Sequence, residues 1–280
     1  GSNLFDDLRE NRQTVSQILS EGNENSTSGG TYAEGYGESS QDVLIGSFLT
    51  TYLGKSANEK NINPFALTPL PNWSITFDGI SKIKKLKDFF KTITFKHAYR
   101  STFSIANYTT NLEAKTTNLA TDLSEKDLNG NFIPIKQISS INLTEQISPL
   151  FGVDATLENS LLVKFEYKKE RNLSLSLTNS QLMEIKRNDI VVGSGYRFED
   201  VELPFEIGGK RPVSNLNLRV DVTFSDNKTI IRKILENQNQ ATSGQKQLKI
   251  KVSADYQIGP SLTVRYYYDH NITDPVINTS

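Results

Sequence analysis

The C-terminal half of the chain alternates between apolar and polar residues with a period of two. The pattern is clearest from Ile141 to Leu157, where most odd-numbered positions are apolar and most even-numbered positions are polar. Because successive side chains of a β-strand point to opposite faces, this segment predicts a strand with one apolar and one polar face. A globular strand usually has about 5–6 residues, whereas a strand that crosses a bilayer obliquely needs about 9–11. This segment is longer than both.

The same alternation predicts further strands, about nine in all. The return strand from Leu161 to Leu177 is interrupted on its apolar side by Lys169 and Arg171. If the strand spans a membrane, these charges must lie beyond the hydrocarbon, because a lipid-facing Lys or Arg at the midplane costs about 2–4 kcal/mol. The other predicted strands are Asn72–Gly79, Lys91–Thr109, Ile190–Phe198, Asn215–Ser225, Thr229–Leu235, Lys246–Ile258 and Leu262–His270, with turns that include Glu158–Ser160, Lys186–Asp189, Asp226–Asn227 and Asn237–Gln245.

The N-terminal part has a different pattern. Apolar residues at helical spacing predict helices at Asn3–Glu21 and Gln41–Gly54. A Gly-, Ser- and Asn-rich flexible loop is expected between them. Three prolines make Asn61–Pro71 an extended connector, the basic Ser81–Phe90 segment favours a short helix, and residues 110–131 are polar and are expected to form a loop.

Composition narrows the classes of protein to which the chain can belong. It has 280 residues with 31 basic and 32 acidic side chains, so its net charge of -1 gives no attraction to nucleic acid. Mean hydropathy is -0.44, and no run reaches the roughly 18 apolar residues of a membrane helix. Any membrane span must therefore be built from strands, which satisfy their backbone in lipid only as a closed barrel. Because the start lacks both a signal peptide and Met, and because no closing strand with a terminal aromatic is found, we expect a fragment of a longer protein.

No residue pattern predicts catalysis or metal binding. Cysteine is absent, which excludes disulfides and thiolate sites. The two histidines, His97 and His270, have no metal-ligand partner at the usual spacing. His97 and Ser101 are too far apart along a strand to hydrogen-bond. Gly29–Gly37 is glycine-rich but lacks the Lys-Ser/Thr pair of a phosphate-binding loop. We therefore expect no enzyme and no cofactor.

Several phrases, in consistent order along almost the whole chain, match one family. They are Leu70-Pro71-Asn72-Trp73, Phe77-Asp78-Gly79, Lys96-His97-Ala98-Tyr99-Arg100-Ser101-Thr102, Phe151-Gly152-Val153-Asp154, Glu166-Tyr167-Lys168-Lys169-Glu170-Arg171, Gly193-Ser194-Gly195-Tyr196-Arg197-Phe198, Asp226-Asn227-Lys228-Thr229-Ile230-Ile231-Arg232 and Ala241-Thr242-Ser243-Gly244-Gln245. In these phrases the chain resembles the outer-membrane translocon of the bacterial type 9 secretion system, the SprA/Sov family.

The resemblance implies both an architecture and a set of partners. The family's proteins are much longer than this chain, so the match is to a portion near their C-terminus. They form a very large single-chain barrel that passes folded cargo proteins to the cell surface. A periplasmic plug protein gates the pore, and a cargo-shuttle barrel protein of the outer membrane takes cargo sideways from it.

We therefore expect a mainly β chain that forms an antiparallel segment of a very large transmembrane β-barrel, with N-terminal helices. Residues 1–60 are expected to be a helical and loop segment in the lumen or periplasm, and residues 61–280 barrel strands and loops. Apolar positions face outer-membrane lipid, and Tyr256, Tyr266 and Tyr268 lie near strand ends, as in an interfacial girdle. The polar positions expected to line the lumen are Lys164, Glu166, Lys168, Arg219, Asp221, Lys249, Lys251, Asp255 and Arg265.

Two other architectures fit the same alternation. One is a small self-contained outer-membrane barrel, a porin or anchor, which requires pairing between the first and last strands of this chain. The other is a soluble β-sandwich adhesion module, in which the apolar faces of two sheets pack together.

Overall fold

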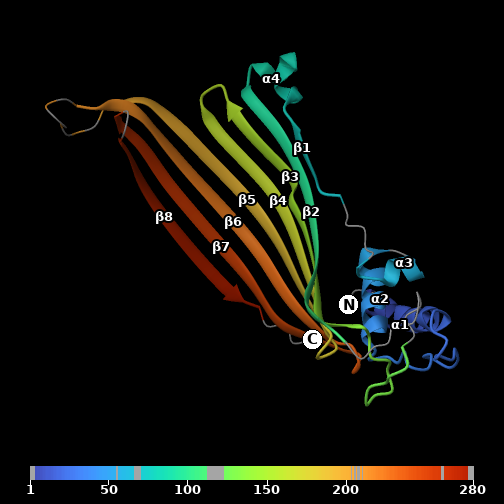
Figure 1. Ribbon diagram of the computed structural model, residues 1–280. Helices are drawn as coiled ribbons and strands as arrows, with labels where there is room; N and C mark the ends of the chain where they lie inside the picture. The colour runs from blue at the N-terminus through green and yellow to red at the C-terminus, as the bar shows by residue number, and fades with distance from the viewer. Residues whose placement is uncertain are drawn as a thin grey trace.

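The chain forms one long-stranded antiparallel sheet with a small group of helices at one end (Figure 1). The computed structural model describes residues 4–54, 56–65, 71–111, 123–202, 204, 206, 209, 211–259 and 262–276. Within these residues every strand pairs with the next one along the chain, in the order β1 to β8. The helical elements are α1 (Leu4–Glu21), α2 (Gln41–Leu53), α3 (Glu59–Ile62), η1 (Gly79–Lys82) and α4 (Lys84–Lys87), and the strands are β1 (Trp73–Phe77), β2 (Phe90–Thr110), β3 (Lys136–Leu157), β4 (Leu161–Ser176), β5 (Gln181–Glu202), β6 (Val213–Lys233), β7 (Gln238–Gly259) and β8 (Leu262–Pro275).

The predicted strands are found in the sheet, except that Asn215–Ser225 and Thr229–Leu235 belong to one strand, β6, and three predicted turns are wrong. Lys186–Asp189 lies inside β5 and Asp226–Asn227 inside β6, where Lys186 pairs with Lys228 and Asn188 with Asp226. Residues 238–245 begin β7, and the turn before it is at 234–237. The polar residues of these three segments pair with residues of neighbouring strands and do not form turns. The described residues therefore contain eight strands, and β3, β5 and β7 reach 22 residues each.

The two predicted N-terminal helices are confirmed over their described residues. In α1, Phe5, Leu8 and Val15 follow helical spacing and are buried. In α2, all residues from Val43 to Tyr52 are buried, and Gly54 ends the helix with a positive φ of 62°, a conformation that glycine adopts at no steric cost. Part of the predicted connector forms α3, and residues 66–70 lie outside the described residues.

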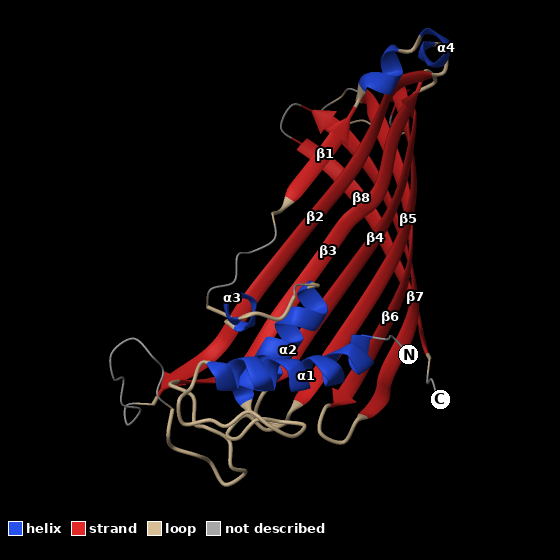
Figure 2. Ribbon diagram, turned by 90° about the vertical axis from the view of Figure 1, so that its right-hand side faces the viewer, coloured by secondary structure: helices blue, strands red, loops and turns tan. Residues whose placement is uncertain are grey.

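Helices α1 and α2 pack across one face of the sheet, near the β4–β5 and β6–β7 turns (Figure 2). We call this surface the helix face and the opposite surface the polar face. The shared core contains Phe5, Leu8, Leu44, Ile45, Phe48, Leu49 and Tyr52 from the helices and Ile138, Ile141, Leu143, Leu173, Leu175, Leu182 and Ile234 from the sheet end. The helices therefore cover only the last rows of the strands, and α4 lies at the other end (Figure 1).

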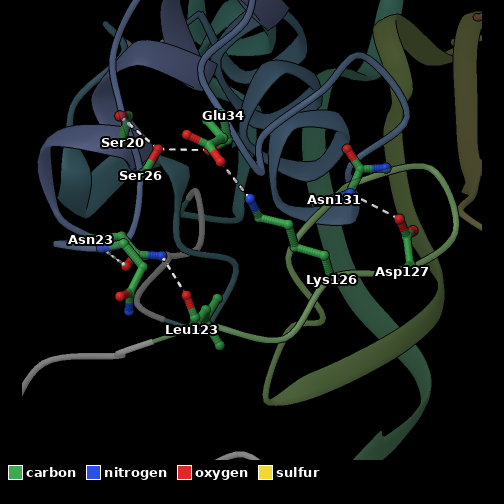
Figure 3. Close-up of polar contacts among 9 residues, drawn as sticks. Ser20, Asn23, Ser26, Glu34, Leu123, Lys126, Asp127 and Asn131 are labelled. Atoms are coloured by element: carbon green, nitrogen blue, oxygen red, sulfur yellow. Dashed lines mark hydrogen bonds and ion pairs between the residues drawn. The ribbon is translucent and has the colours of Figure 1, made fainter.

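The segment between α1 and α2 has no helix or strand, as predicted, but hydrogen bonds join it to its surroundings (Figure 3). The Asn23 amide donates to the Leu123 carbonyl at 3.1 Å, and the Ser26 hydroxyl donates to the Glu34 carbonyl at 2.7 Å. The Lys126 ammonium lies 2.7 Å from the Glu34 carboxylate. These contacts connect the loop to the segment that precedes β3. Of the predicted 110–131 loop, residues 112–122 lie outside the described residues.

One carboxyl group in α2 makes this helical group sensitive to pH. Burial raises the pKa of Asp42 to about 6, against an ordinary value near 3.8. A raised carboxyl pKa favours the protonated folded state, so its contribution to stability is full below about pH 4 and is lost as pH rises through 6. Asp42→Asn is therefore expected to stabilise the protein by about 1–3 kcal/mol at pH 7.5 and to change little at pH 4.

Thermal unfolding of the intact protein at pH 4 and pH 7.5 measures this difference. Glu10→Gln, on the exposed side of α1, is the matched control and should shift neither melting temperature. Equal effects of Asp42→Asn at the two pH values would contradict the buried-carboxyl explanation.

Candidate functional site

The pairing of residues across neighbouring strands shows which side chains lie on each face of the sheet. Directly paired residues on neighbouring antiparallel strands have side chains on the same face. Tyr167 pairs with Ile190, which pairs with Phe224, and the row continues through Leu248 to Ile272. This row belongs to the helix face, because Tyr167 shares its parity on β4 with Leu173 and Leu175, which contact the helices.

From this row to the far end of the sheet, the helix face is almost entirely apolar and open to its surroundings. Phe224 is 52% exposed and Tyr266 is 66% exposed. We call this surface the apolar band. On β4 to β8 it contains Val163, Phe165, Tyr167, Ile190, Val192, Tyr196, Phe198, Leu216, Leu218, Val220, Val222, Phe224, Leu248, Ile250, Val252, Ala254, Val264, Tyr266, Tyr268 and Ile272.

The band has a defined height. On β6 it runs from Leu216 to Phe224, an interval that rises about 26 Å along the strand at about 3.3 Å per residue. At the tilt of about 35–45° that strands have in membrane barrels, this rise would correspond to a height of about 20 Å.

A charged row forms the border between the apolar band and the helices. Lys169 pairs with Asn188, Asn188 with Asp226, Asp226 with Lys246, and Lys246 with Asp274. The next row toward the helices contains Arg171, Lys186 and Lys228. Lys169 and Arg171, which interrupt the alternation of β4, therefore lie just outside the band.

Aromatic residues are frequent at both borders. Near the charged row, the Trp73 ring stacks on Tyr99 with their centroids 4.4 Å apart. At the far border, Tyr196 and Phe198 have centroids 4.6 Å apart. Tyr266 and Tyr268 are exposed on the band, as their parity predicts, but Tyr268 pairs with Val252 in the middle row of the band and not at a border.

Tyr256 differs from the other predicted border tyrosines because its side chain is buried, with 7% of the residue exposed. Its hydroxyl donates to the Val201 or the Pro212 carbonyl, at 2.7 and 2.9 Å. It therefore fixes the β5–β6 connection.

All nine side chains that the sequence places on the polar parity lie on the polar face. Lys164 pairs with Gly193, Gly193 with Asp221, and Asp221 with Lys251, so residues from four strands share one row. Glu166 and Lys168 follow Lys164 on β4, Lys249 precedes Lys251 on β7, Arg219 and Asp221 alternate on β6, and Asp255 pairs with Arg265.

Ion pairs organise this polar face. The Glu166 carboxylate lies 3.0 Å from the Lys164 ammonium and 2.9 Å from that of Lys168. The Arg219 guanidinium lies 2.8 Å from Asp221. Arg265 and Asp255 are joined at 2.5 Å. Opposite charges therefore alternate over the surface, without an extended area of one sign.

Gly193 gives the ion pairs of this face the space that they occupy. A Cβ atom at this position would lie 2.3 Å from the Asp221 carboxylate and 3.3 Å from the Lys164 Cβ. A larger residue would push these two side chains apart. Packing therefore explains why a glycine, and not a larger residue, occupies position 193 in the Gly193–Phe198 phrase.

A buried ionic cluster joins the sheet to the helices. Glu184 on β5 is fully buried and accepts hydrogen bonds from Arg171 Nε and Arg232 Nη2, both at 2.9 Å. The Arg171 guanidinium lies over the Tyr52 ring of α2, and that of Arg232 over the Phe5 ring of α1. Sequence reasoning missed this cluster, although Arg171 and Glu184 both interrupt the apolar side of their strands.

Neither histidine lies in a reactive cluster. His97 Nδ1 is 2.8 Å from the Leu150 carbonyl, and the His270 ring stacks on Tyr268. Among the residues that the structure describes, no three His, Cys, Asp or Glu side chains are grouped so as to hold a metal ion. No helix in the same part of the chain is both long enough and apolar enough to cross a membrane.

The basic segment before β2 stands apart from both faces. Lys85, Lys87 and Lys91 lie in and after α4, at the end of the sheet remote from α1 and α2 (Figure 1). The Lys91 ammonium donates to the Ser160 hydroxyl at 3.2 Å, which ties this end of β2 to the β3–β4 turn.

The sheet is open. Strands β1 and β8 lie at its opposite edges, and over the described ranges they do not pair with each other. Closure within this chain, which a self-contained small barrel requires, is thus not found there. Comparison with known proteins adds no assignment, since no protein-family model and no curated protein matches the chain.

Proposed function

We propose that this chain is a section of the wall of an outer-membrane β-barrel that conducts folded proteins to the cell surface. The observation that carries the proposal is the helix face, where an exposed apolar band runs for about 26 Å along β6 and ends in a charged row. At the tilt of barrel strands this band is about 20 Å tall, which is close to the apolar belt of about 25 Å on a membrane barrel. An apolar surface of this extent on a monomer in water is an aggregation hazard.

In this proposal the apolar band faces lipid and the polar face lines the lumen. A polar interior is typical of barrels that contain water. The ion pairs of Glu166, Asp221 and Asp255 balance part of the positive charge. A hydrated surface of mixed sign allows different cargo proteins to pass without holding any one of them tightly.

The same orientation changes the expectation for residues 1–60. The helices pack on the face that carries the apolar band, not on the face that carries the polar parity. They therefore lie outside the wall, in water next to the membrane surface, and the lumenal position expected from the sequence does not fit this orientation. A periplasmic position remains compatible with it.

The open edges support a wall section rather than a complete small barrel. An unpaired strand edge cannot remain in lipid, because its backbone groups have no other partner there. In this proposal further strands of the same protein pair with β1 and β8. The partners follow from the family resemblance: cargo proteins, a cargo-shuttle barrel and a periplasmic plug, with no catalytic role for this chain.

Single cysteines at neighbouring positions of β7 test the proposal. In a cysteine-free version of the intact protein, Val252→Cys lies in the apolar band and Lys251→Cys on the polar face at the same height. In outer-membrane vesicles, Val252→Cys is expected to resist a water-soluble maleimide. A fluorophore at that position should be quenched by brominated lipid. Lys251→Cys should react rapidly and show no quenching.

Two results would contradict the proposal. One is equal maleimide reactivity at the two positions, because a wall between lipid and water must protect one of them. The other is release of the intact protein from membranes by carbonate without detergent, which would show that the sheet does not span the membrane.

A further inference from the structure

A furrow crosses the helix face between the apolar band and the charged row. It is a cavity of about 480 Å³ that extends over β4 to β8. Its apolar wall contains Tyr167, Ile190, Phe224, Leu248 and Ile272, and its polar wall contains Asn188, Asp226, Lys246 and Asp274. In the orientation proposed above, this furrow lies at the height where lipid headgroups meet acyl chains.

The polar wall carries charges of both signs in a fixed order. Asp226, Lys246 and Asp274 are direct neighbours on β6, β7 and β8. Among the described residues, no ion pair within 4.0 Å joins Lys246 to either carboxylate. Two rows nearer the helices, by contrast, the Glu184 carboxylate is paired with three basic side chains. The furrow thus keeps a cation and two anions available for a ligand.

We propose that this furrow binds a phospholipid whose headgroup carries a primary ammonium and a phosphate, that is, an ethanolamine phospholipid of the membrane; this inference rests on the proposed function. The Lys246 ammonium donates to the phosphate, and the Asp226 and Asp274 carboxylates accept hydrogen bonds from the lipid ammonium. Charge-assisted hydrogen bonds of this kind are short and strong. The acyl chains lie along Phe224 and Leu248.

The same charges discriminate between headgroups. A choline headgroup has no N–H to donate to the two carboxylates. A glycerol headgroup has no positive charge, so Asp226 and Asp274 repel its phosphate. The site therefore prefers ethanolamine lipid over both, although Lys169 and Lys228 add positive charge nearby.

Native mass spectrometry tests this preference with the intact protein in detergent micelles. The probes are phosphatidylethanolamine, phosphatidylcholine and phosphatidylglycerol with matched acyl chains, added singly at equal concentration. We expect the ethanolamine lipid to be retained about tenfold more than either other lipid. The double variant Asp226→Asn/Asp274→Asn should lose this preference, and Lys246→Gln should reduce retention of all three lipids.

A matched control uses the polar face of the same strands. Asp221→Asn and Lys251→Gln change the same residue types on β6 and β7 and should leave lipid retention unchanged. Equal retention of the three lipids by the unaltered protein, or an unchanged preference in the double variant, would overturn the inference. That failure is distinguishable from failure of the proposed function, because the cysteine experiment reports membrane exposure whichever lipid is bound.

Discussion

Glu184→Gln is expected to detach the helices from the sheet and to destabilise the protein by about 3–5 kcal/mol. The Glu184 carboxylate is fully buried and is the anionic partner of Arg171, Lys186 and Arg232. The amide replaces it without changing its size, so packing is kept while the negative charge is lost. Two guanidinium groups then lose the carboxylate that they share, although Arg171 keeps Glu145 at 3.8 Å and Arg232 still donates to the Asn239 side chain.

Hydrogen exchange of the intact protein measures this effect locally. Amides of α1 and α2 should lose protection in Glu184→Gln, while those of β6 and β7 in the apolar band should not. Glu166→Gln is the matched control, because Glu166 also bridges basic side chains but lies on the polar face, away from the helices. Equal loss of protection in the two variants would show that the cluster does not hold the helices in place.

A second substitution separates charge from packing in this cluster. Arg232→Met removes one buried cation, so combining it with Glu184→Gln should restore part of the lost stability. If the two effects simply add, the ionic contact between Glu184 and Arg232 is not the reason for the destabilisation.

Much of the sheet could be predicted from the alternation alone, for a physical reason. When one face of a strand contacts an apolar environment and the other contacts water, apolar and polar residues alternate along the strand. This alternation is sufficient to locate β2, β3 and β4 in the amino-acid sequence. The same logic placed Lys164, Arg219 and Lys251 together on one face, although they lie on different strands. Parity is a local property, and it is kept when strands pair in register.

The predictions from the sequence were wrong where one short pattern is compatible with both a turn and a strand. A short polar stretch such as Asp226–Asn227 is typical of a turn, but in β6 it is part of a charged row that extends across neighbouring strands. Only the pairing register distinguishes the two. The Glu184 cluster depends on register in the same way, because its partners Arg171 and Arg232 are distant in the sequence.

The position of the helices could not be predicted, because apolar residues on the same face of a strand can be covered by helices or belong to the exposed apolar band. Leu173 and Leu175 continue the apolar side of β4, yet they lie under α1 and α2, while Phe165 on the same side is exposed. The charged rows at Lys169 and Arg171 separate these two zones. The interruptions of the alternation are thus the border between a protein core and the apolar band.

Val192→Lys and Val191→Lys are expected to have very different effects, although they change adjacent valines of β5. Val192 lies in the apolar band between Phe165 and Val222, and Val191 lies on the polar face next to Glu166. A lysine within the hydrocarbon of a membrane barrel costs about 2–4 kcal/mol near the midplane. Val191→Lys adds a cation to a hydrated surface beside a carboxylate, and we expect a change of less than about 0.5 kcal/mol.

Urea unfolding of the intact protein in lipid vesicles measures both variants under the same conditions. The midpoint for Val192→Lys should fall clearly, and its amount in the outer-membrane fraction should fall with it, while Val191→Lys follows the unaltered protein. The neighbouring positions share chain, strand and residue type, so only the face differs between them. If Val191→Lys were the more damaging change, lipid and lumen would have to exchange sides, and the helices would then lie inside the barrel.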